Sequence, residues 1–359
     1  MTNSLSDIME VALLLSTVAT GLLGFLLIFN AARLDGKTVI ITGANSGIGR
    51  ETALDLAKRG ARIILACRNM DSAHDASCYI EERVPGAEVI MKHLDLASLK
   101  SVRQFAEDLC ETEQSVDILI NNAAVGGIPY TKTEDGYEMT LAVNHLGHFL
   151  LTNLLLPKLK ASAPSRIINV AAHAHIFYSI DFQDLMLEKS YRPIKAYCRS
   201  KLANVLFTRR LAKRLRGTGV TTYALHPGMV YSRLTCNLFT STIPIISTVL
   251  NILSKYLLKS PKEGCQTVVY CAISEELTDE SGLYYSNCAL SMPTMTALHE
   301  GHAKLLWRES LKLADLPRDE VESDDEEEDS DDEIEYNEDD NSDIAIEDDN
   351  DDYMDDEIN

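Results

Sequence analysis

Short apolar segments alternate with segments of helical periodicity between residues 37 and 225. The apolar segments are rich in β-branched residues and cover 37–43, 61–66, 89–91, 116–120, 166–170 and 220–225. The helical segments include 47–59, 99–109, 139–159 and 197–215. Strands that are apolar along their whole length and separated by helices are typical of a parallel sheet buried on both faces. The pattern predicts a single doubly wound α/β domain over residues 35–316.

The turn after the first strand reads TGANSGIG at 42–49. Glycines between a strand and a helix let the backbone approach a pyrophosphate, and the helix start offers it free N–H groups and a positive dipole end. A glycine trio alone is weak evidence, but here a strand precedes it and a helix follows. We therefore assign a dinucleotide-binding turn to Gly43, Asn45, Ser46, Gly47, Ile48 and Gly49.

The end of the second strand indicates which dinucleotide is bound. It reads LACRN at 65–69, with Arg68 and no acidic residue. An NAD site places an acid near this point to bind the ribose 2′-hydroxyl, whereas a 2′-phosphate calls for a base. The sequence therefore favours NADP(H).

Tyr197 and Lys201 form a YxxxK pair in a predicted helix. Because four residues make about one helical turn, the phenol and the ammonium share a face. A free phenol has a pKa near 10, and a neighbouring cation favours its ionised form. We predict that this pair exchanges a proton with a carbonyl or alcohol oxygen while hydride moves to or from a nicotinamide.

Together these residues resemble the short-chain dehydrogenase/reductase family, and more closely its membrane-bound, retinol dehydrogenase-like branch. The resemblance covers about residues 35–313, and its fold is a Rossmann-like domain. It is carried by the glycine turn, ACR at 66–68, LDL at 94–96, NNAA at 121–124, VNHLGHF at 143–149, the 197–215 helix, TGVTTYALHPG at 218–228 and Ser232.

The resemblance also assigns roles to single residues. It implies that Asp95, Asn122 and Ala123 bind the adenosine half of the cofactor, and that Pro227, Gly228 and Ser232 flank the nicotinamide. It implies that Asn144 supports a proton relay with Lys201, which also binds the nicotinamide ribose. The implied substrates are retinaldehyde, retinol and other lipophilic aldehydes or alcohols.

The fifth-strand motif departs from the family. The family ends this motif in two serines, the second of which binds the substrate oxygen, but this chain reads NVAAH at 169–173 and places Ala172 there. Losing one such donor costs about 10²–10³ in rate. Three interpretations remain open: a slow reductase, an enzyme in which His173 or His175 substitutes, and an NADP(H)-binding pseudoenzyme that acts through partners.

The N-terminal end carries an uncharged apolar run at 11–29. As a helix it spans about 28 Å, close to the hydrocarbon thickness of a bilayer. A signal peptide would have a basic start, but Asp7 and Glu10 precede the run, and a core helix would be unusual just before the first strand. We predict a membrane anchor at 8–30. Arg33 and Lys37 follow it, which places the domain in the cytosol, with the endoplasmic reticulum as the family's usual membrane.

The C-terminal end is an acidic tail. Residues 319–359 hold 25 of the 55 Asp and Glu and no Lys or Arg, so 30 acids remain against 33 bases elsewhere, about +3. Such a tail cannot bury enough apolar surface to fold, and we predict disorder over 317–359. Acids follow Ser323 and Ser330, which suits an acid-directed kinase, and the tail is a candidate binding segment for a protein partner.

Other classes of function lack support. A nearly neutral domain has no basic patch for nucleic acid. The eight cysteines are scattered without a CxxC pair, which fits reduced thiols and no metal site.

The apolar segment at 243–258 is predicted to form a lipid-facing pocket wall or to pack in the core. The resemblance also implies homodimers through the fourth and fifth helices.

Overall fold

The computed structural model describes residues 32–242 and 258–317, which fold around one sheet. The sheet has the order β3-β2-β1-β4-β5-β6-β7-β8, and its pairs are parallel except that between β7 and β8. The strands are β1 Thr38–Thr42, β2 Arg62–Cys67, β3 Val89–His93, β4 Ile118–Asn121, β5 Ser165–Val170, β6 Val220–His226, β7 Leu283–Ser286 and β8 Ala289–Ser291. The predicted parallel α/β sheet is confirmed.

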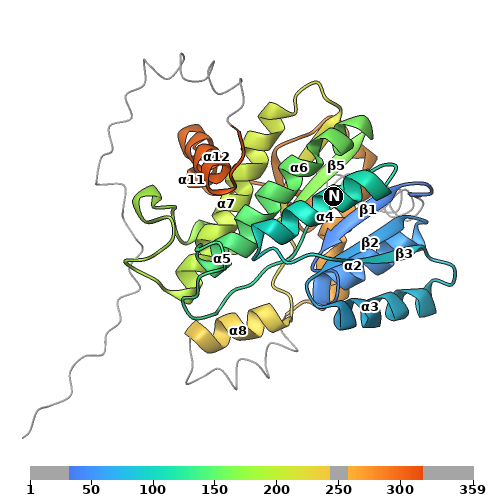
Figure 1. Cartoon of the computed structure of the whole chain (residues 1–359), viewed down its shortest axis with the longest axis horizontal. Helices are drawn as coiled ribbons and strands as arrows, with labels where there is room; N and C mark the ends of the chain where they lie inside the picture. The colour runs from blue at the N-terminus through green and yellow to red at the C-terminus, as the bar shows by residue number, and fades with distance from the viewer. Residues whose placement is uncertain (1–31, 243–257, 318–359) are drawn as a thin grey trace, which may run out of the picture. The chain divides into compact units, whose positions relative to one another are not determined.

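Helices cover both faces of this sheet (Figure 1). They are α2 Gly47–Lys58, α3 Met70–Arg83, α4 Leu99–Thr112, α5 Met139–Leu141, α6 Gly147–Ala161, α7 Pro193–Arg214, α8 Arg233–Thr242, α10 Pro261–Ile273, α11 Met295–Leu298 and α12 Glu300–Leu313. One buried cluster packs α2, α3 and α10 against the sheet, and a second packs α4, α6, α7 and α12 on the other face. The central strands β1, β2, β4, β5 and β6 are buried between these two layers, which explains their apolar runs in the sequence.

The order of the strands reverses between β1 and β4. From β1 the chain winds outward to β2 and β3, and then returns to β4 and continues in the other direction. In open α/β sheets, ligands bind at this switch point, beyond the carboxyl ends of the strands. The glycine turn after β1 and the NNAA segment after β4 meet there.

Three features differ from the sequence prediction. β7 and the antiparallel β8 were not predicted, because each is short and β8 is mostly exposed. The helix predicted at 139–159 contains a π-helical turn, η1 Ala142–Leu146. The helix predicted to begin at Tyr197 begins at Pro193, where proline suits the first turn because its missing N–H has no helical partner.

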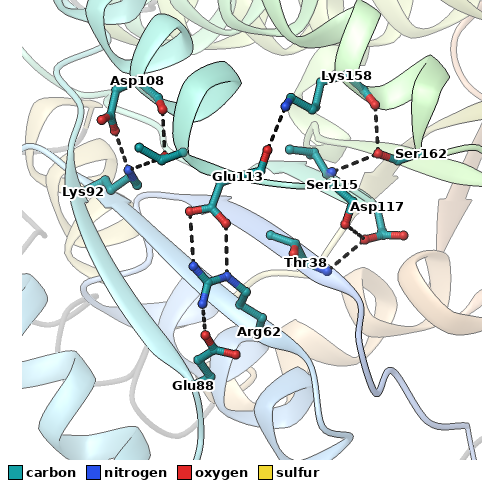
Figure 2. A network of polar contacts seen from close by, with 12 residues as sticks. Thr38, Arg62, Glu88, Lys92, Asp108, Glu113, Ser115, Asp117, Lys158 and Ser162 are labelled. Carbon is teal, nitrogen blue, oxygen red and sulfur yellow. Dashed lines mark hydrogen bonds and ion pairs between the residues drawn. The ribbon is translucent and has the colours of Figure 1, made fainter.

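At the edge of the sheet opposite the glycine turn, where β1, β2 and β4 begin, a network of polar contacts links the strands (Figure 2). The Arg62 guanidinium donates to both carboxylate oxygens of Glu113, at 3.0 and 3.3 Å, and also pairs with Glu88. The carboxylate of Asp117 accepts from the Thr38 amide at 2.9 Å and from Lys37 Nζ at 2.7 Å. Since Glu113 and Asp117 are almost fully buried, their satisfied charges fix the starts of β1, β2 and β4.

The helical stretch Met139–Ala161 is long and apolar enough to cross a membrane, but 78% of its most apolar window is buried inside the fold. It therefore reads as the core helix of this domain. The predicted anchor at 8–30 and the acidic tail at 318–359 lie outside the described residues, as does most of the apolar segment at 243–258.

Candidate active site

The glycine turn and the segment after β4 approach each other closely. A Cβ on Gly43 would lie 2.9 Å from the Cα of Ala123, and one on Gly49 would lie 2.6 Å from Nδ2 of Asn122. Asn122 Nδ2 in turn donates to the Thr42 carbonyl at 2.8 Å. Two of the three glycines are therefore required for the packing of these two loops.

The third glycine leaves open space. Gly47 has a φ of +56°, and a Cβ built on it meets no atom within 4 Å. Ser46 precedes α2 without capping it through its side chain, so the first N–H groups of this helix lack that side-chain acceptor. An unobstructed helix start beside a tight glycine turn fits the pyrophosphate of a dinucleotide.

Two further predicted cofactor residues follow β2 and β3. Arg68 is exposed directly after β2, and the described part of the chain gives its guanidinium no hydrogen-bond or ion-pair partner. Asp95 is half-buried after β3, where its carboxylate accepts from the Ala97 amide at 3.0 Å. Both residues lie at the carboxyl edge of the sheet, on the side where the glycine turn begins.

The predicted nicotinamide-flanking residues follow β6 at the same edge. Pro227 is buried, and Gly228 has a φ of +91° with the Lys259 side chain 2.8 Å from the position of a Cβ. Only glycine adopts this conformation beside such a neighbour without strain. Ser232 Oγ accepts from the Thr235 amide at 3.2 Å and so caps α8.

The YxxxK pair lies on α7, against the end of β5. Tyr197 is 7% exposed and Lys201 is 2% exposed, and Lys201 Nζ lies 5.7 Å from the centroid of the Tyr197 ring. Lys201 Nζ donates to the Val170 carbonyl at 2.8 Å. This hydrogen bond holds the ammonium at Val170, the last residue of β5, which precedes Ala172 by two residues.

Burial sets the protonation of both groups. It raises the pKa of the Tyr197 phenol well above its ordinary value and lowers the pKa of Lys201 to about 7. The sequence predicted that the lysine would favour the ionised phenol. In this structure burial is the dominant influence on both groups, so it favours the protonated tyrosine and leaves the lysine poised between its two forms.

Asn144 lies in the π-helical turn η1 and is fully buried. Its side-chain oxygen accepts from the Val125 amide at 2.8 Å, and its side-chain nitrogen donates to the Val125 carbonyl at 2.8 Å and to Ser200 Oγ at 2.9 Å. The π-turn thus joins the loop after β4 to the helix of Tyr197. Such turns are frequent at functional sites.

Ala172 follows β5 with extended backbone and is buried. The two histidines considered as substitutes for its missing hydroxyl differ in availability. His175 Nδ1 lies 2.8 Å from the Ala172 carbonyl, and its Nε2 accepts from the Thr294 amide at 3.2 Å, so both ring nitrogens are engaged. His173 is exposed, and no hydrogen bond to its ring occurs among the described residues.

Comparison with known proteins agrees with this arrangement. The family profile described as short chain dehydrogenase matches residues 37–242. The chain is 51% identical over 286 residues to human retinol dehydrogenase 13, covering 79% of this chain and 86% of that protein. It is 49% identical over 287 residues to mouse retinol dehydrogenase 11, covering 80% and 89% of the two chains.

The chain belongs to the short-chain dehydrogenase family.

Solved structures share the fold. An uncharacterized protein from Mycobacterium paratuberculosis is 32% identical, with a TM-score of 0.64 over 80% of this chain and 96% of that one. A structure described as an NAD(P) dependent gluconate 5-dehydrogenase from Beutenbergia cavernae, with bound NADP at low occupancy, is 26% identical, with a TM-score of 0.57 over 72% and 97% of the two chains. Membership implies an oxidoreductase that uses a nicotinamide cofactor.

Several residues of this short-chain dehydrogenase site were not singled out from the sequence. A Cβ on Gly126 would lie 2.7 Å from Cδ2 of Tyr197, so this glycine makes room for the tyrosine ring. Thr42, His148 and Ser200 join the elements of the site by hydrogen bonds. The paired glycines at 126 and 127 were a usable sequence signal, whereas the partners of Thr42, His148 and Ser200 depend on long-range packing.

Proposed function

We propose that this short-chain dehydrogenase is an NADP(H)-dependent oxidoreductase that reduces lipophilic aldehydes such as retinaldehyde, or oxidises the corresponding alcohols. The observation that carries this proposal is the buried Tyr197 beside Lys201, at the same sheet edge as the open glycine turn. A bound nicotinamide cofactor would supply the hydride. Tyr197 supplies the proton that the carbonyl oxygen needs to become a hydroxyl.

The protonation state of Tyr197 favours reduction over oxidation. Because burial raises the pKa of its phenol, the tyrosine begins the reaction with its proton. A general acid must be protonated when the aldehyde binds. Lys201, whose pKa lies at about 7, gains a positive charge at little energetic cost and stabilises the tyrosinate that forms.

The preference for NADP(H) is supported by Arg68. This residue directly follows β2, is exposed, and has no acidic partner within the described ranges. A free guanidinium binds a phosphate through two parallel hydrogen bonds. In that role Arg68 would hold the 2′-phosphate, while the N–H groups at the start of α2 would hold the pyrophosphate.

Lipophilic substrates are supported by exposed apolar side chains at the carboxyl edge. At this edge Ile176 and Phe177 follow β5 and Met229 follows β6, whereas Met292 and Met295 follow the antiparallel β8; all five are 42–78% exposed. The hydrogen bond from the Thr294 amide to His175 brings the segments after β5 and after β8 together. Exposed apolar clusters mark binding surfaces in soluble domains. The names of the relatives, which specify retinol, agree with a substrate of this class.

A second candidate function rests on Ala172. Its methyl group cannot donate a hydrogen bond to the substrate oxygen, and His175 has no free ring nitrogen to replace it. A chain that keeps Lys201 for the cofactor ribose can bind NADP(H) without turnover. We therefore keep an NADP(H)-binding pseudoenzyme, acting as a membrane-bound regulatory or scaffold protein, as the alternative.

Location and partners complete the proposal. The sequence supports a single-pass N-terminal anchor at 8–30 in the endoplasmic reticulum, with the catalytic domain in the cytosol and the acidic tail available to a protein partner.

The position of α12 limits which surface a homodimer could use. Trp307 packs 5.0 Å from the Phe149 ring and stacks 5.9 Å from the Phe207 ring. Because α12 covers α6 and α7, a dimer on this side would bury α12 as well.

NADPH consumption by the purified full-length protein tests the proposal. All-trans-retinaldehyde in detergent is the first substrate, followed by medium-chain aldehydes. We expect loss of NADPH absorbance with stoichiometric formation of the alcohol, and slower loss with NADH. Intact NADPH binding without turnover of any of these aldehydes would instead establish the pseudoenzyme.

A further inference from the structure

Two buried histidines lie next to Asn144, His145 within the π-turn and His148 in the first turn of α6, and they contact different parts of the fold. His145 and His148 are 1% and 3% exposed. His145 Nε2 lies 2.8 Å from Ser310 Oγ of α12. His148 Nε2 lies 2.8 Å from Thr42 Oγ1, at the glycine turn. Only the second histidine therefore touches the nucleotide-binding end of the domain.

The hydrogen bonds of Thr42 determine the tautomer of His148. The Thr42 hydroxyl oxygen accepts from the amides of Asn122 at 2.9 Å and Ala123 at 3.0 Å. A hydroxyl has two acceptor positions and one proton, so the proton remains for donation. His148 Nε2 at 2.8 Å is a nearer acceptor than the Ile120 carbonyl at 3.4 Å. His148 Nε2 therefore accepts, and its Nδ1 carries the ring proton.

The ring proton of His148 makes the next hydrogen bond in a series that leads to Tyr197. Nδ1 lies 3.2 Å from the main-chain carbonyl of Asn144 and donates to it. Asn144 Nδ2 donates to Ser200 Oγ at 2.9 Å, and Ser200 Oγ donates to the main-chain carbonyl of Tyr197 at 2.7 Å. Every donor in this series points in the same direction, from the glycine turn to Tyr197. Burial lowers the pKa of His148 to about 3, so the imidazole stays neutral throughout the working pH range.

We propose that His148 is a positioning residue that couples the nucleotide-binding turn to Tyr197, through the directional hydrogen-bond chain Thr42–His148–Asn144–Ser200–Tyr197. A cofactor seated on the turn fixes Thr42, and the chain transmits that order to the π-turn and to the first turn of α7. Both ring nitrogens of His148 are engaged by groups of the protein, so it acts through these hydrogen bonds. Its contribution is to hold Asn144 and Tyr197 in register with the bound dinucleotide. The inference rests on the proposed reductase function.

Three variants test the coupling. His148→Leu removes both hydrogen bonds of the ring, whereas His148→Gln can accept from Thr42 and donate to the Asn144 carbonyl. His145→Leu is the matched control, since this histidine is equally buried in the same helical stretch but bonds to α12. The readouts are kcat and KM for retinaldehyde, the NADPH dissociation constant, and thermal stability of the full-length protein.

We expect His148→Leu to lower kcat at least tenfold while the KM for retinaldehyde changes less than threefold. His148→Gln should recover kcat to within threefold of the parent. His145→Leu should lower the melting temperature but keep kcat within about twofold. Equal loss of kcat in His148→Gln and His148→Leu, or in His145→Leu and His148→Leu, would overturn the proposal.

Hydrogen exchange separates this inference from the proposed function, because it needs cofactor binding and no turnover. In the parent and in His148→Gln, saturating NADPH should slow amide exchange in peptides that cover 142–148 and 193–201. In His148→Leu, NADPH should protect the glycine turn only. Protection of 193–201 in His148→Leu equal to that in the parent would refute the coupling, whether or not the parent reduces aldehydes.

Discussion

Lys201 Nζ lies 5.7 Å from the centroid of the Tyr197 ring and donates its hydrogen bond to the Val170 carbonyl. The ammonium is thus held by the strand and not by the phenol. Both side chains are buried, and each is driven toward its neutral form. This arrangement suits a site that starts with a protonated tyrosine and becomes ionic only as the proton leaves.

The depressed pKa of Lys201 predicts a pH dependence of stability. Between about pH 7 and 10 the unfolded chain binds a proton at this lysine that the folded chain does not, so the free energy of unfolding should rise with pH in this window. The slope of the free energy of unfolding against pH should be steeper in the parent than in Lys201→Met, by at most about 1.4 kcal/mol per pH unit. Denaturant unfolding of the cofactor-free protein, followed by fluorescence of the single tryptophan, measures both slopes. Identical slopes would mean that the lysine keeps an ordinary pKa.

Ala172→Ser should increase the rate of aldehyde reduction. The new hydroxyl can donate to the substrate oxygen as negative charge develops there, and one such donor contributes about 10²–10³ in kcat, so we expect a gain of at least tenfold. Ala171→Ser is the matched control, because successive residues of extended backbone point to opposite faces. Ala171 is buried in the core cluster beside Leu202. An equal gain in both variants would show that the effect does not arise at the substrate oxygen.

Arg68→Ala should weaken NADPH binding while leaving NADH binding unchanged. Loss of charge-assisted hydrogen bonds to the 2′-phosphate costs about 1.5–3 kcal/mol, which corresponds to roughly 10- to 100-fold in the dissociation constant. Titration of each nucleotide by fluorescence provides the measurement. Lys58→Ala removes another exposed cation and should leave both affinities unchanged. If Arg68→Ala weakens the binding of NADH and of NADPH equally, this arginine does not bind the 2′-phosphate.

Asp117→Asn should destabilise the fold without affecting the cofactor site. The Asp117 side chain is 6% exposed and pairs with Lys37 at the amino edge, far along the strands from the glycine turn. We expect a loss of about 1–3 kcal/mol in the free energy of unfolding. Asp108→Asn breaks the pair with Lys92 at a carboxylate that is 52% exposed, and should cost less than about 1 kcal/mol. Equal losses in the two variants would contradict the importance of burial in this network.

The sequence was sufficient for the parts of the fold that depend on local pattern. The strands β1 to β6 and the glycine turn follow from apolar runs and from the position of three glycines. β7 and β8 escaped prediction because Leu283–Ser286 and Ala289–Ser291 are too short to show a period and are stabilised by pairing with β6 and with each other. The antiparallel edge of the sheet is therefore a product of tertiary structure.

The candidate site was predictable at Tyr197, Lys201 and the glycine turn, because each has a characteristic spacing. The π-turn at Asn144 was not, since a single extra residue in a helical turn leaves the apolar pattern of 139–159 nearly unchanged. The direction of the pKa shift at Tyr197 was not readable from the sequence either. Spacing places the lysine on the same face, but only the folded core shows that burial raises the pKa of the phenol.

The most direct test of the proposed function compares the parent with Tyr197→Phe in NADPH-dependent reduction of retinaldehyde. The variant keeps the ring in its buried place and removes only the hydroxyl. We predict that the parent turns over, that Tyr197→Phe loses at least about 10²-fold in kcat because its general acid is gone, and that the NADPH dissociation constant changes less than twofold. Turnover by Tyr197→Phe at the rate of the parent would contradict the role of Tyr197 as proton donor and the proposed mechanism with it.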